Sequence, residues 1–77
     1  MINLEFTADE LIQAPQARSL VTGKSIMVFN VKMSDKTAHL NTGNKFDYQN
    51  ESYEIMTRES IHAPVIYLKF NCVRKTA

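Results

Sequence analysis

Cysteine is nearly absent from this chain of 77 residues, and Cys72 is the single one. An internal disulfide is therefore excluded, and the sequence has no Cys/His cluster of the kind that holds structural zinc. A lone free thiol fits a reducing compartment. Domains of this size are marginally stable without such cross-links, so we expect a tight core or association with another subunit.

The chain also lacks an excess of either charge, with nine Lys and Arg against eight Asp and Glu. This balance argues against a strongly electrostatic nucleic-acid binder, which usually carries a clear basic excess. No apolar run approaches the roughly 18 residues of a membrane span. Residues 2–6 alternate without the basic flank of a signal peptide. We therefore expect no membrane partner and a cytoplasmic location.

No catalytic motif is evident. His39 and His62 are the only histidines, and each lacks the orienting partner that catalysis or metal binding needs. Residues 22–25 read Thr-Gly-Lys-Ser, like the end of a phosphate-binding loop. However, Arg18 stands where that motif needs glycine, and the residues that follow favour a strand. We expect no enzymatic activity, no cofactor, no metal and no small-molecule substrate.

The C-terminal third has the clearest pattern, an antiparallel meander over residues 45–73. A short strand with Phe46 and Tyr48 precedes a turn at residues 49–51, a strand over 52–58, a loop and a strand over 65–73. The last strand alternates over eight residues. This pattern predicts that Phe29 and Val31 share the core with four residues of that strand: Ile66, Leu68, Phe70 and Cys72.

The N-terminal part predicts shorter elements. Residues 2–6 alternate as a strand, and a two-turn helix is expected over 8–14, because Thr7 and Glu10 form a capping box and Pro15 ends it. Strands are expected over 18–22 and 25–33, joined at Gly23. A turn over 34–36, a short strand over 37–40 and a loop over 41–44 follow. Three methionines are expected as core fillers: Met27, Met33 and Met56.

Together these elements predict a mostly β fold with one short α-helix. Six strands, counted without the short one over 37–40, suit an antiparallel barrel or sandwich of the SH3-like or OB-like kind. The domain is expected to cover residues 1–77, with a short basic tail over 74–77.

The candidate partner-binding residues gather at the end of the chain: Tyr67, Lys69, Arg74 and Lys75. OB-like sheets bind single strands by stacking bases on aromatic rings while Lys and Arg follow the phosphates. Arg18 and Lys24 add positive charge to this nucleic-acid interpretation.

The tyrosines beside the hairpin turn have a simpler interpretation. Tyr48 and Tyr53 can form a cross-strand pair that covers the edge of the core. Glu51, Glu54 and Glu59 place negative charge near the same hairpin, which weakens the nucleic-acid interpretation.

Residues 40–73 resemble the C-terminal part of small head–tail joining and head-closure proteins of tailed phages. The matching residues are Gly43, Phe46, Tyr48, Tyr53, Ile55 and the strand over 65–73. The resemblance covers under half of the chain. It implies a β-barrel connector without enzymatic activity that works in a ring, located in the virion or the host cytoplasm.

Two functions remain open from the sequence. The first is a structural or interaction protein that binds a protein partner or another copy of itself, since a small β domain leaves open strand edges. The strand over 25–33, apolar on both faces in its first half, is expected to need cover most. The alternative is a single-stranded nucleic-acid binder on an OB-like barrel.

Overall fold

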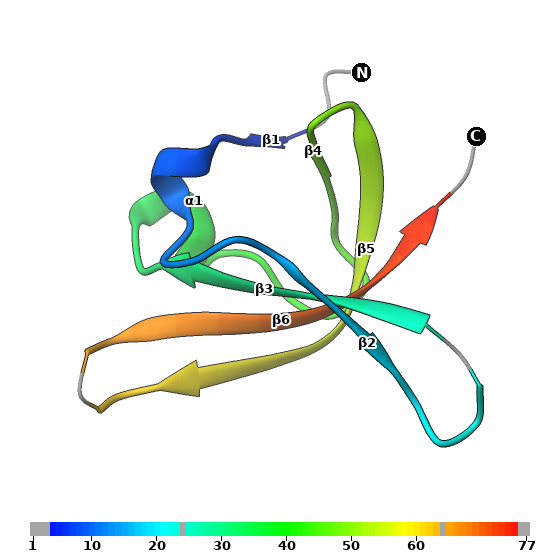
Figure 1. Cartoon of the computed structure of the whole chain (residues 1–77). Helices are drawn as coiled ribbons and strands as arrows, with labels where there is room; N and C mark the ends of the chain where they lie inside the picture. The colour runs from blue at the N-terminus through cyan, green and yellow to red at the C-terminus, as the bar shows by residue number, and fades with distance from the viewer. Residues whose placement is uncertain (1–3, 24, 64, 76–77) are drawn as a thin grey trace.

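The computed structural model describes residues 4–23, 25–63 and 65–75, which form one six-stranded sheet (Figure 1). The strands are β1 (Glu5–Phe6), β2 (Gln16–Ser19), β3 (Ser25–Lys32), β4 (Lys45–Tyr48), β5 (Glu51–Ile61) and β6 (Tyr67–Lys75). Their order across the sheet is β1-β4-β5-β6-β3-β2. The helical elements of the described residues are a 3₁₀ turn, η1 (Ala8–Glu10), and one short α-helix, α1 (Asp35–Ala38). The prediction of a mostly β fold with one short helix is confirmed.

The strands β4, β5 and β6 form the predicted antiparallel meander. The turn between β4 and β5 consists of Gln49 and Asn50, whose φ angles are 50° and 66°. Two positive φ values are typical of a type I′ turn, whose twist matches that of paired strands. β3 adds antiparallel to β6, with Phe29 opposite Phe70. β5 runs three residues past its predicted end, and β6 begins two residues late and continues to Lys75.

A β-bulge bends the middle of β5. Ile55 pairs with Cys72 and Thr57 pairs with Asn71, so Met56 is an extra residue on its strand. Bulges of this kind bend a strand and increase its twist. Figure 1 shows β5 turning between its hairpin with β4 and its end beneath β6. The bend brings the β4 end of the sheet over β3.

The N-terminal segment supplies both edge strands of this curled sheet. β1 pairs in parallel with β4, whereas β2 pairs antiparallel with β3. Between them, Leu11 forms an isolated bridge with Val31. No ladder joins the edge strand β2 to β1 or β4 within the described residues, so the sheet is barrel-like and incompletely closed.

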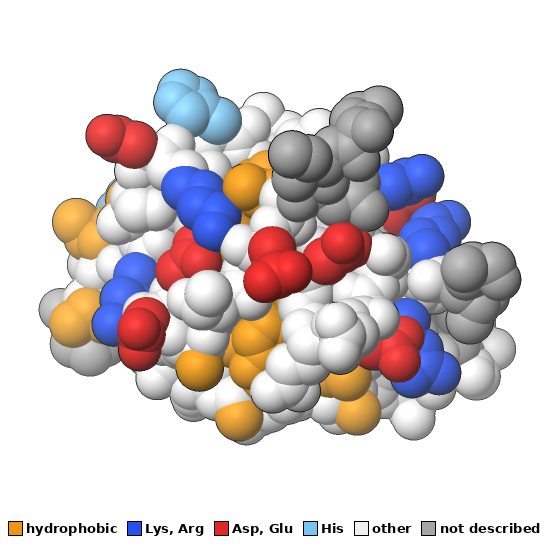
Figure 2. All heavy atoms as spheres, turned by 90° about the horizontal axis from the view of Figure 1, so that it is seen from above, with side chains coloured by type: hydrophobic (Ala, Val, Ile, Leu, Met, Phe, Trp, Pro, Cys, Tyr) orange, Lys and Arg blue, Asp and Glu red, His pale blue; other side chains and the backbone are white. Residues whose placement is uncertain are grey.

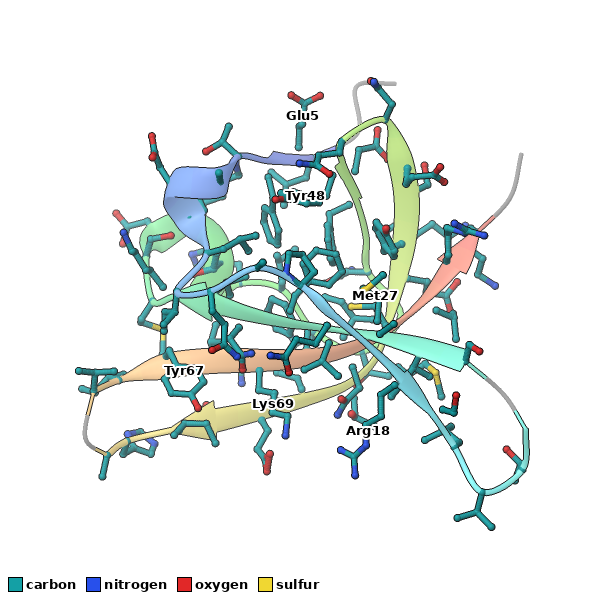
Figure 3. The ribbon with its side chains drawn as sticks, in the orientation of Figure 1. Glu5, Arg18, Met27, Tyr48, Tyr67 and Lys69 are labelled. Atoms are coloured by element: carbon teal, nitrogen blue, oxygen red, sulfur yellow. The ribbon has the colours of Figure 1, made fainter. Side chains whose placement is uncertain are left out.

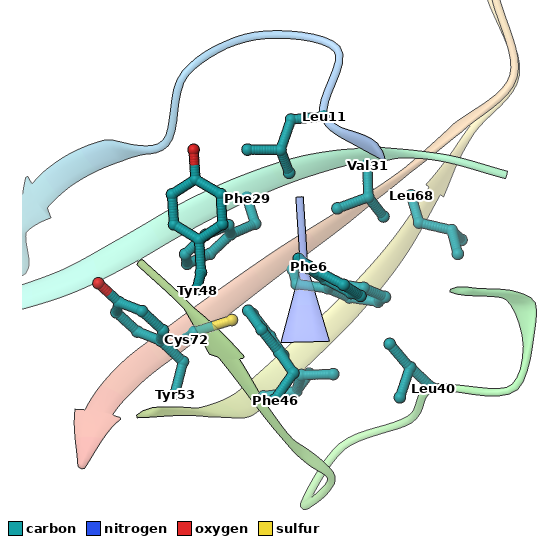
Figure 4. Packing of buried hydrophobic residues seen from close by; sticks show 12 residues of the cluster. Phe6, Leu11, Phe29, Val31, Leu40, Phe46, Tyr48, Tyr53, Leu68 and Cys72 are labelled. Carbon is teal, nitrogen blue, oxygen red and sulfur yellow. The ribbon is translucent and has the colours of Figure 1, made fainter. Parts of the chain in front are cut away.

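The core fills the inside of the curl (Figure 4). Phe6 stacks on Phe46 with ring centroids 4.3 Å apart. Twelve buried residues form one cluster: Phe6, Leu11, Phe29, Val31, Leu40, Phe46, Tyr48, Tyr53, Ile55, Leu68, Phe70 and Cys72. Five of the six predicted core residues are confirmed, but Ile66 is wrong, since it is 58% exposed and precedes β6. An alternating pattern predicts the facing of a residue only where the strand is actually paired.

The predicted helix over 8–14 is also wrong. Only η1 forms, although the Glu10 carboxylate accepts a hydrogen bond from the Thr7 amide at 3.1 Å, as its capping box requires. The chain then becomes extended, because Leu11 bridges to Val31 and the Ile12 amide donates to the Asn30 carbonyl at 2.8 Å. Pairing with β3 replaces the few hydrogen bonds that two isolated helical turns would offer.

The short helix lies instead at α1, where a turn and then a strand over 37–40 were predicted. Ser34 caps it by accepting a hydrogen bond from the Thr37 amide at 3.2 Å. The Thr37 hydroxyl donates to the Lys32 carbonyl at 2.7 Å, and this side chain is fully buried. Thr37 is β-branched and therefore suggests a strand, but here its side chain fixes a helical turn to the end of β3.

Several smaller predictions need correction. β2 lies at Gln16–Ser19, not over 18–22, because the Gly23 amide donates to the Leu20 carbonyl and forms a turn there. Of the three methionines only Met27 packs against the core; Met33 is 40% exposed and Met56 occupies the bulge. The expected cross-strand pair of tyrosines does not form.

The register shows why that pair is absent. Tyr53 lies opposite Phe46, and Tyr48 lies opposite Glu51. Both tyrosines are nevertheless core residues, since each makes an edge contact with the Phe29 ring. β3, which was expected to need an outside partner most, lies between β6 and β2 inside the sheet.

Candidate functional site

Two surfaces of the protein present side chains that a ligand or partner could reach. The first is the outer side of β2, β3 and β6, away from the core. Residues directly opposite each other on neighbouring strands project to the same face. Asn30 is opposite Lys69, and Lys32 is opposite Tyr67. Figure 3 shows Arg18, Tyr67 and Lys69 on this outer side.

The cations on this side differ from most others in having no acidic partner. Lys36, Arg74 and Lys75 lie within 4.0 Å of a carboxylate, and the Arg58 guanidinium donates to the Ala38 carbonyl at 3.4 Å. Within the described part of the chain, four cations have no such partner: Arg18, Lys32, Lys45 and Lys69. Three of these four lie on the outer side of neighbouring strands. We call Arg18, Lys32, Tyr67 and Lys69 the cationic face.

A shallow polar pocket of about 280 Å³ lies within the cationic face. Arg18, Tyr67 and Lys69 line it together with three side-chain amides, Gln13, Gln16 and Asn30. Asn30 is buried, and its carbonyl is held by the Ile12 amide, so the pocket floor is fixed by backbone pairing. Lys69 also faces Glu59 across the β5–β6 ladder.

The structure thus divides the predicted partner-binding residues into two groups. Tyr67 and Lys69 come together with Arg18, but Arg74 and Lys75 do not join them. Arg74 lies 4.0 Å from Glu51, and Lys75 lies 3.5 Å from Glu54. Both belong to β6, not to a tail, and their charges are turned toward β5. Lys24 lies outside the described residues.

The second surface is where the barrel stays open beside β2. One pocket of about 430 Å³ is lined by Ala17, Ile26, Met27, Tyr53, Val73 and Arg74, among others. A second, of about 310 Å³, is lined by Ala14, Pro15, Met27, Tyr48, Gln49 and Tyr53. The two pockets share Met27 and Tyr53 as their floor. We call the two together the β2 trough.

One wall of the β2 trough is the edge of β2, and the other is formed by the rings of Tyr48 and Tyr53. All four residues of β2 are exposed, and β2 pairs with β3 only. Across the trough stand the tyrosines of the β4–β5 hairpin. The pKa of Tyr53 is raised by burial and by the charge of Glu51, so its hydroxyl stays protonated and remains a hydrogen-bond donor.

The face seen from the side of β1 carries charges of both signs. Figure 2 shows acidic side chains in its middle with basic side chains nearby. His39 and His62 are both exposed, on separate segments. No group of three or more His, Cys, Asp or Glu side chains suited to a metal occurs in residues 4–23, 25–63 and 65–75. None of the helices in these ranges is long and apolar enough to cross a bilayer.

Sequence reasoning missed Lys32, Asn30 and the β2 trough. Lys32 and Asn30 share one face of an alternating strand, so the signal for them was present in the sequence. The trough had no such signal, because it joins Ala17 of β2 and the residues just before it to Tyr48 and Tyr53 of the distant β4–β5 hairpin. Comparison of the chain with protein-family models, with curated proteins and with solved structures finds no match.

Proposed function

We propose that this chain is a non-enzymatic interaction protein that takes up an extended segment of a partner polypeptide alongside β2. The observation that carries the proposal is an exposed edge strand, paired on one side only, next to a trough lined by Met27 and Tyr53. No other strand of the described sheet combines these two features, since the other edge, β1, has only two residues.

The edge of β2 supports this proposal through its backbone. An edge strand presents a row of unpaired N–H and C=O groups. Another polypeptide strand carries N–H and C=O groups at the same intervals, so it can pair with this row and lie about 4.8 Å from β2. Charged residues and prolines within an edge strand oppose pairing with another chain. β2 has little of this protection, because Arg18 is its only charged residue and Pro15 lies before the strand, outside it.

The β2 trough supports the proposal through side chains. Successive side chains of an added strand point to opposite faces, so every second one would enter the trough. Met27 and Tyr53 form an apolar floor with a hydroxyl at its side. The proposed partner segment therefore has apolar side chains at alternate positions.

A library of random peptides displayed on a carrier, selected against the whole protein, tests the proposal. We expect binders with alternating apolar residues, and slower amide hydrogen exchange in β2 when they bind. We also expect that N-methylation of single peptide amides abolishes binding only at every second position, because only alternate amides of the bound peptide would point toward β2.

Two neighbouring residues of β2 offer a matched pair of variants. Ala17→Glu places a bulky charge beside the trough, whereas Gln16→Glu places the same charge where Val28 lies, on the outer side. We expect Ala17→Glu to weaken peptide binding at least tenfold and Gln16→Glu to change it little. Equal effects of the two variants, or binders without protection of β2, would refute strand addition.

A second copy of the chain is the other possible occupant of this edge. Sedimentation at micromolar concentration distinguishes the two cases. A parent that dimerises and an Ala17→Glu variant that does not would identify a second copy as the occupant of β2 in place of a foreign segment.

The resemblance of residues 40–73 to phage joining proteins favours a virion subunit as the partner, and we offer this as part of the proposal. The residues that carry it have structural roles in the meander. Gly43 has a φ of 93°, and Phe46 and Ile55 are fully buried. Because a meander core needs these residues in any case, the neighbouring genes are the decisive test. Genes for phage capsid and tail assembly beside this one would support a virion partner.

A further inference from the structure

We propose that the cationic face binds single-stranded nucleic acid, at a surface separate from the β2 trough. The first observation is the distribution of charge. Arg18, Lys32 and Lys69 have no carboxylate within 4.0 Å among the described residues, while three other cations are paired. Unpaired cations on one face are directly available to phosphates, whereas a paired cation must first part from its carboxylate.

Rows across the sheet define how these charges lie. Arg18 is opposite Ile26, Asn30 is opposite Lys69, and Lys32 is opposite Tyr67. From the row of Ile26 to the row of Lys32 the sheet extends about 20 Å, at roughly 3.3 Å per residue. The cations therefore line a strip, as a backbone of several phosphates needs. Two carboxylates lie along these rows: Glu59 is opposite Lys69, and Glu54, opposite Val73 near the row of Ile26, is paired with Lys75 at 3.5 Å.

Tyr67 provides the aromatic surface. It lies between Lys32 on β3 and Ile61 on β5, and two residues before Lys69 on its own strand. Its side chain is half-buried, so the ring is held by its neighbours and still reaches solvent. A tyrosine held on a sheet face between cations is the arrangement on which single strands stack their bases.

The pocket beside Tyr67 explains why an unpaired strand fits better than a duplex. Gln13, Gln16 and Asn30 line it with side-chain amides, and each amide offers both donors and an acceptor. Bases in a duplex keep their pairing edges and stacking faces occupied. An unpaired base can place its ring on Tyr67 and its edge against these amides.

Fluorescence anisotropy with labelled oligothymidylate of about eight nucleotides, within the usual range for OB-like sheets, tests this inference over a series of salt concentrations. Three neutralised phosphates predict a slope of log K against log salt of about −2. Lys69→Gln, Lys32→Gln and Arg18→Gln should each reduce this slope by about 0.7. Lys45→Gln, which removes an unpaired cation from β4, should leave it unchanged.

The aromatic contribution is tested separately. Tyr67→Leu should weaken binding roughly 5- to 100-fold at an unchanged salt slope, and Tyr67→Phe should bind like the parent. Thermal melting of each variant shows whether it is folded. If Tyr67→Leu unfolds, the salt slopes of the three Gln variants and the affinity of Tyr67→Phe still test whether the cationic face binds the oligonucleotide.

Four results would overturn the inference. Three of them are no binding at low salt, equal loss of slope in Lys45→Gln, and equal affinity for polyglutamate, which would assign the face to an acidic protein. Equal affinity for duplex DNA would also overturn it, because the pocket would then have no role.

Discussion

Phe29 of β3 meets Phe46 of β4 edge-on, with ring centroids 5.0 Å apart and planes at 90°. These strands are not neighbours in the sheet, since β5 and β6 lie between them. The contact exists because the sheet curls over itself at the bulge in β5. One pair of rings thus joins the two ends of the sheet, and both rings are fully buried.

Removal of one of these rings should therefore be costly. We expect Phe46→Ala to lower the free energy of unfolding by roughly 3–5 kcal/mol, because it leaves a large cavity among Phe6, Phe29 and Tyr53. Urea unfolding followed by circular dichroism measures the change. Ile66→Ala is the control, since Ile66 is 58% exposed, and its effect should stay within about 0.5 kcal/mol. Similar losses for both variants would contradict the described packing.

The hairpin turn offers a stabilising change. Gln49 and Asn50 both have positive φ, which costs a glutamine roughly 1 kcal/mol, whereas Asn-Gly is the preferred pair for this turn. We expect the double variant Gln49→Asn, Asn50→Gly to raise the free energy of unfolding by about 0.5–1 kcal/mol. The reversed order, Gln49→Gly with Asn50 retained, separates the contribution of the first position. A loss of stability in the double variant would mean that the turn is not of type I′.

The meander could be predicted because its signals are local. Leu68, Phe70 and Cys72 alternate with polar residues, and the turn between β4 and β5 is short. The helix over 8–14 was predicted from equally local signals and failed. Leu11 and Ile12 pair with β3, some twenty residues away in the sequence, and local propensity does not contain that competition.

The candidate surfaces were predictable only in part. Tyr67 and Lys69 were placed correctly on the outer side of β6, because alternation alone fixes their facing. The pairing of Arg74 with Glu51 was not foreseen, because the bulge shifts the β5–β6 register by one residue. Which cations remain unpaired depends on that register, so composition and net charge could not identify them.

The single thiol should be unreactive in the folded protein. Cys72 is fully buried, and burial raises its pKa to about 12. Only the thiolate reacts readily, so iodoacetamide at pH 8 should modify Cys72 no faster than the protein opens. Mass spectrometry over time measures this, with the protein in urea as the control. Rapid labelling of the native protein would contradict the burial of Cys72.

The ion pair between Lys36 and Glu10 should make part of the stability sensitive to acid. Lys36 Nζ lies 2.8 Å from Glu10 Oε1 and connects α1 to η1. Burial alone would raise the pKa of Glu10, but the Lys36 hydrogen bond and charge and the Thr7 hydrogen bonds outweigh it, so this pKa is lowered. A carboxyl whose pKa is lowered by folding stabilises the protein above its unfolded pKa. That contribution is lost as the pH falls through the folded pKa.

The pH dependence of a Lys36→Met variant isolates this contribution from the other contacts of Lys36, which are with the Glu5 carbonyl and the Phe6 ring. At pH 7 the variant should be less stable than the parent by up to about 1 kcal/mol, because both side chains are partly exposed and water screens their charges. The difference should shrink as the pH falls below the ordinary range for Glu, about 4, since protonated Glu10 no longer gains from the Lys36 charge. Urea unfolding at a series of pH values measures it. Lys45→Met is the control, because Lys45 has no carboxylate within 4.0 Å among the described residues and should show no such trend. A Lys36→Met deficit that stays constant down to pH 3 would mean that Lys36 stabilises the fold through its contact with the Phe6 ring, 5.5 Å from Nζ, and its hydrogen bond to the Glu5 carbonyl, and not through Glu10.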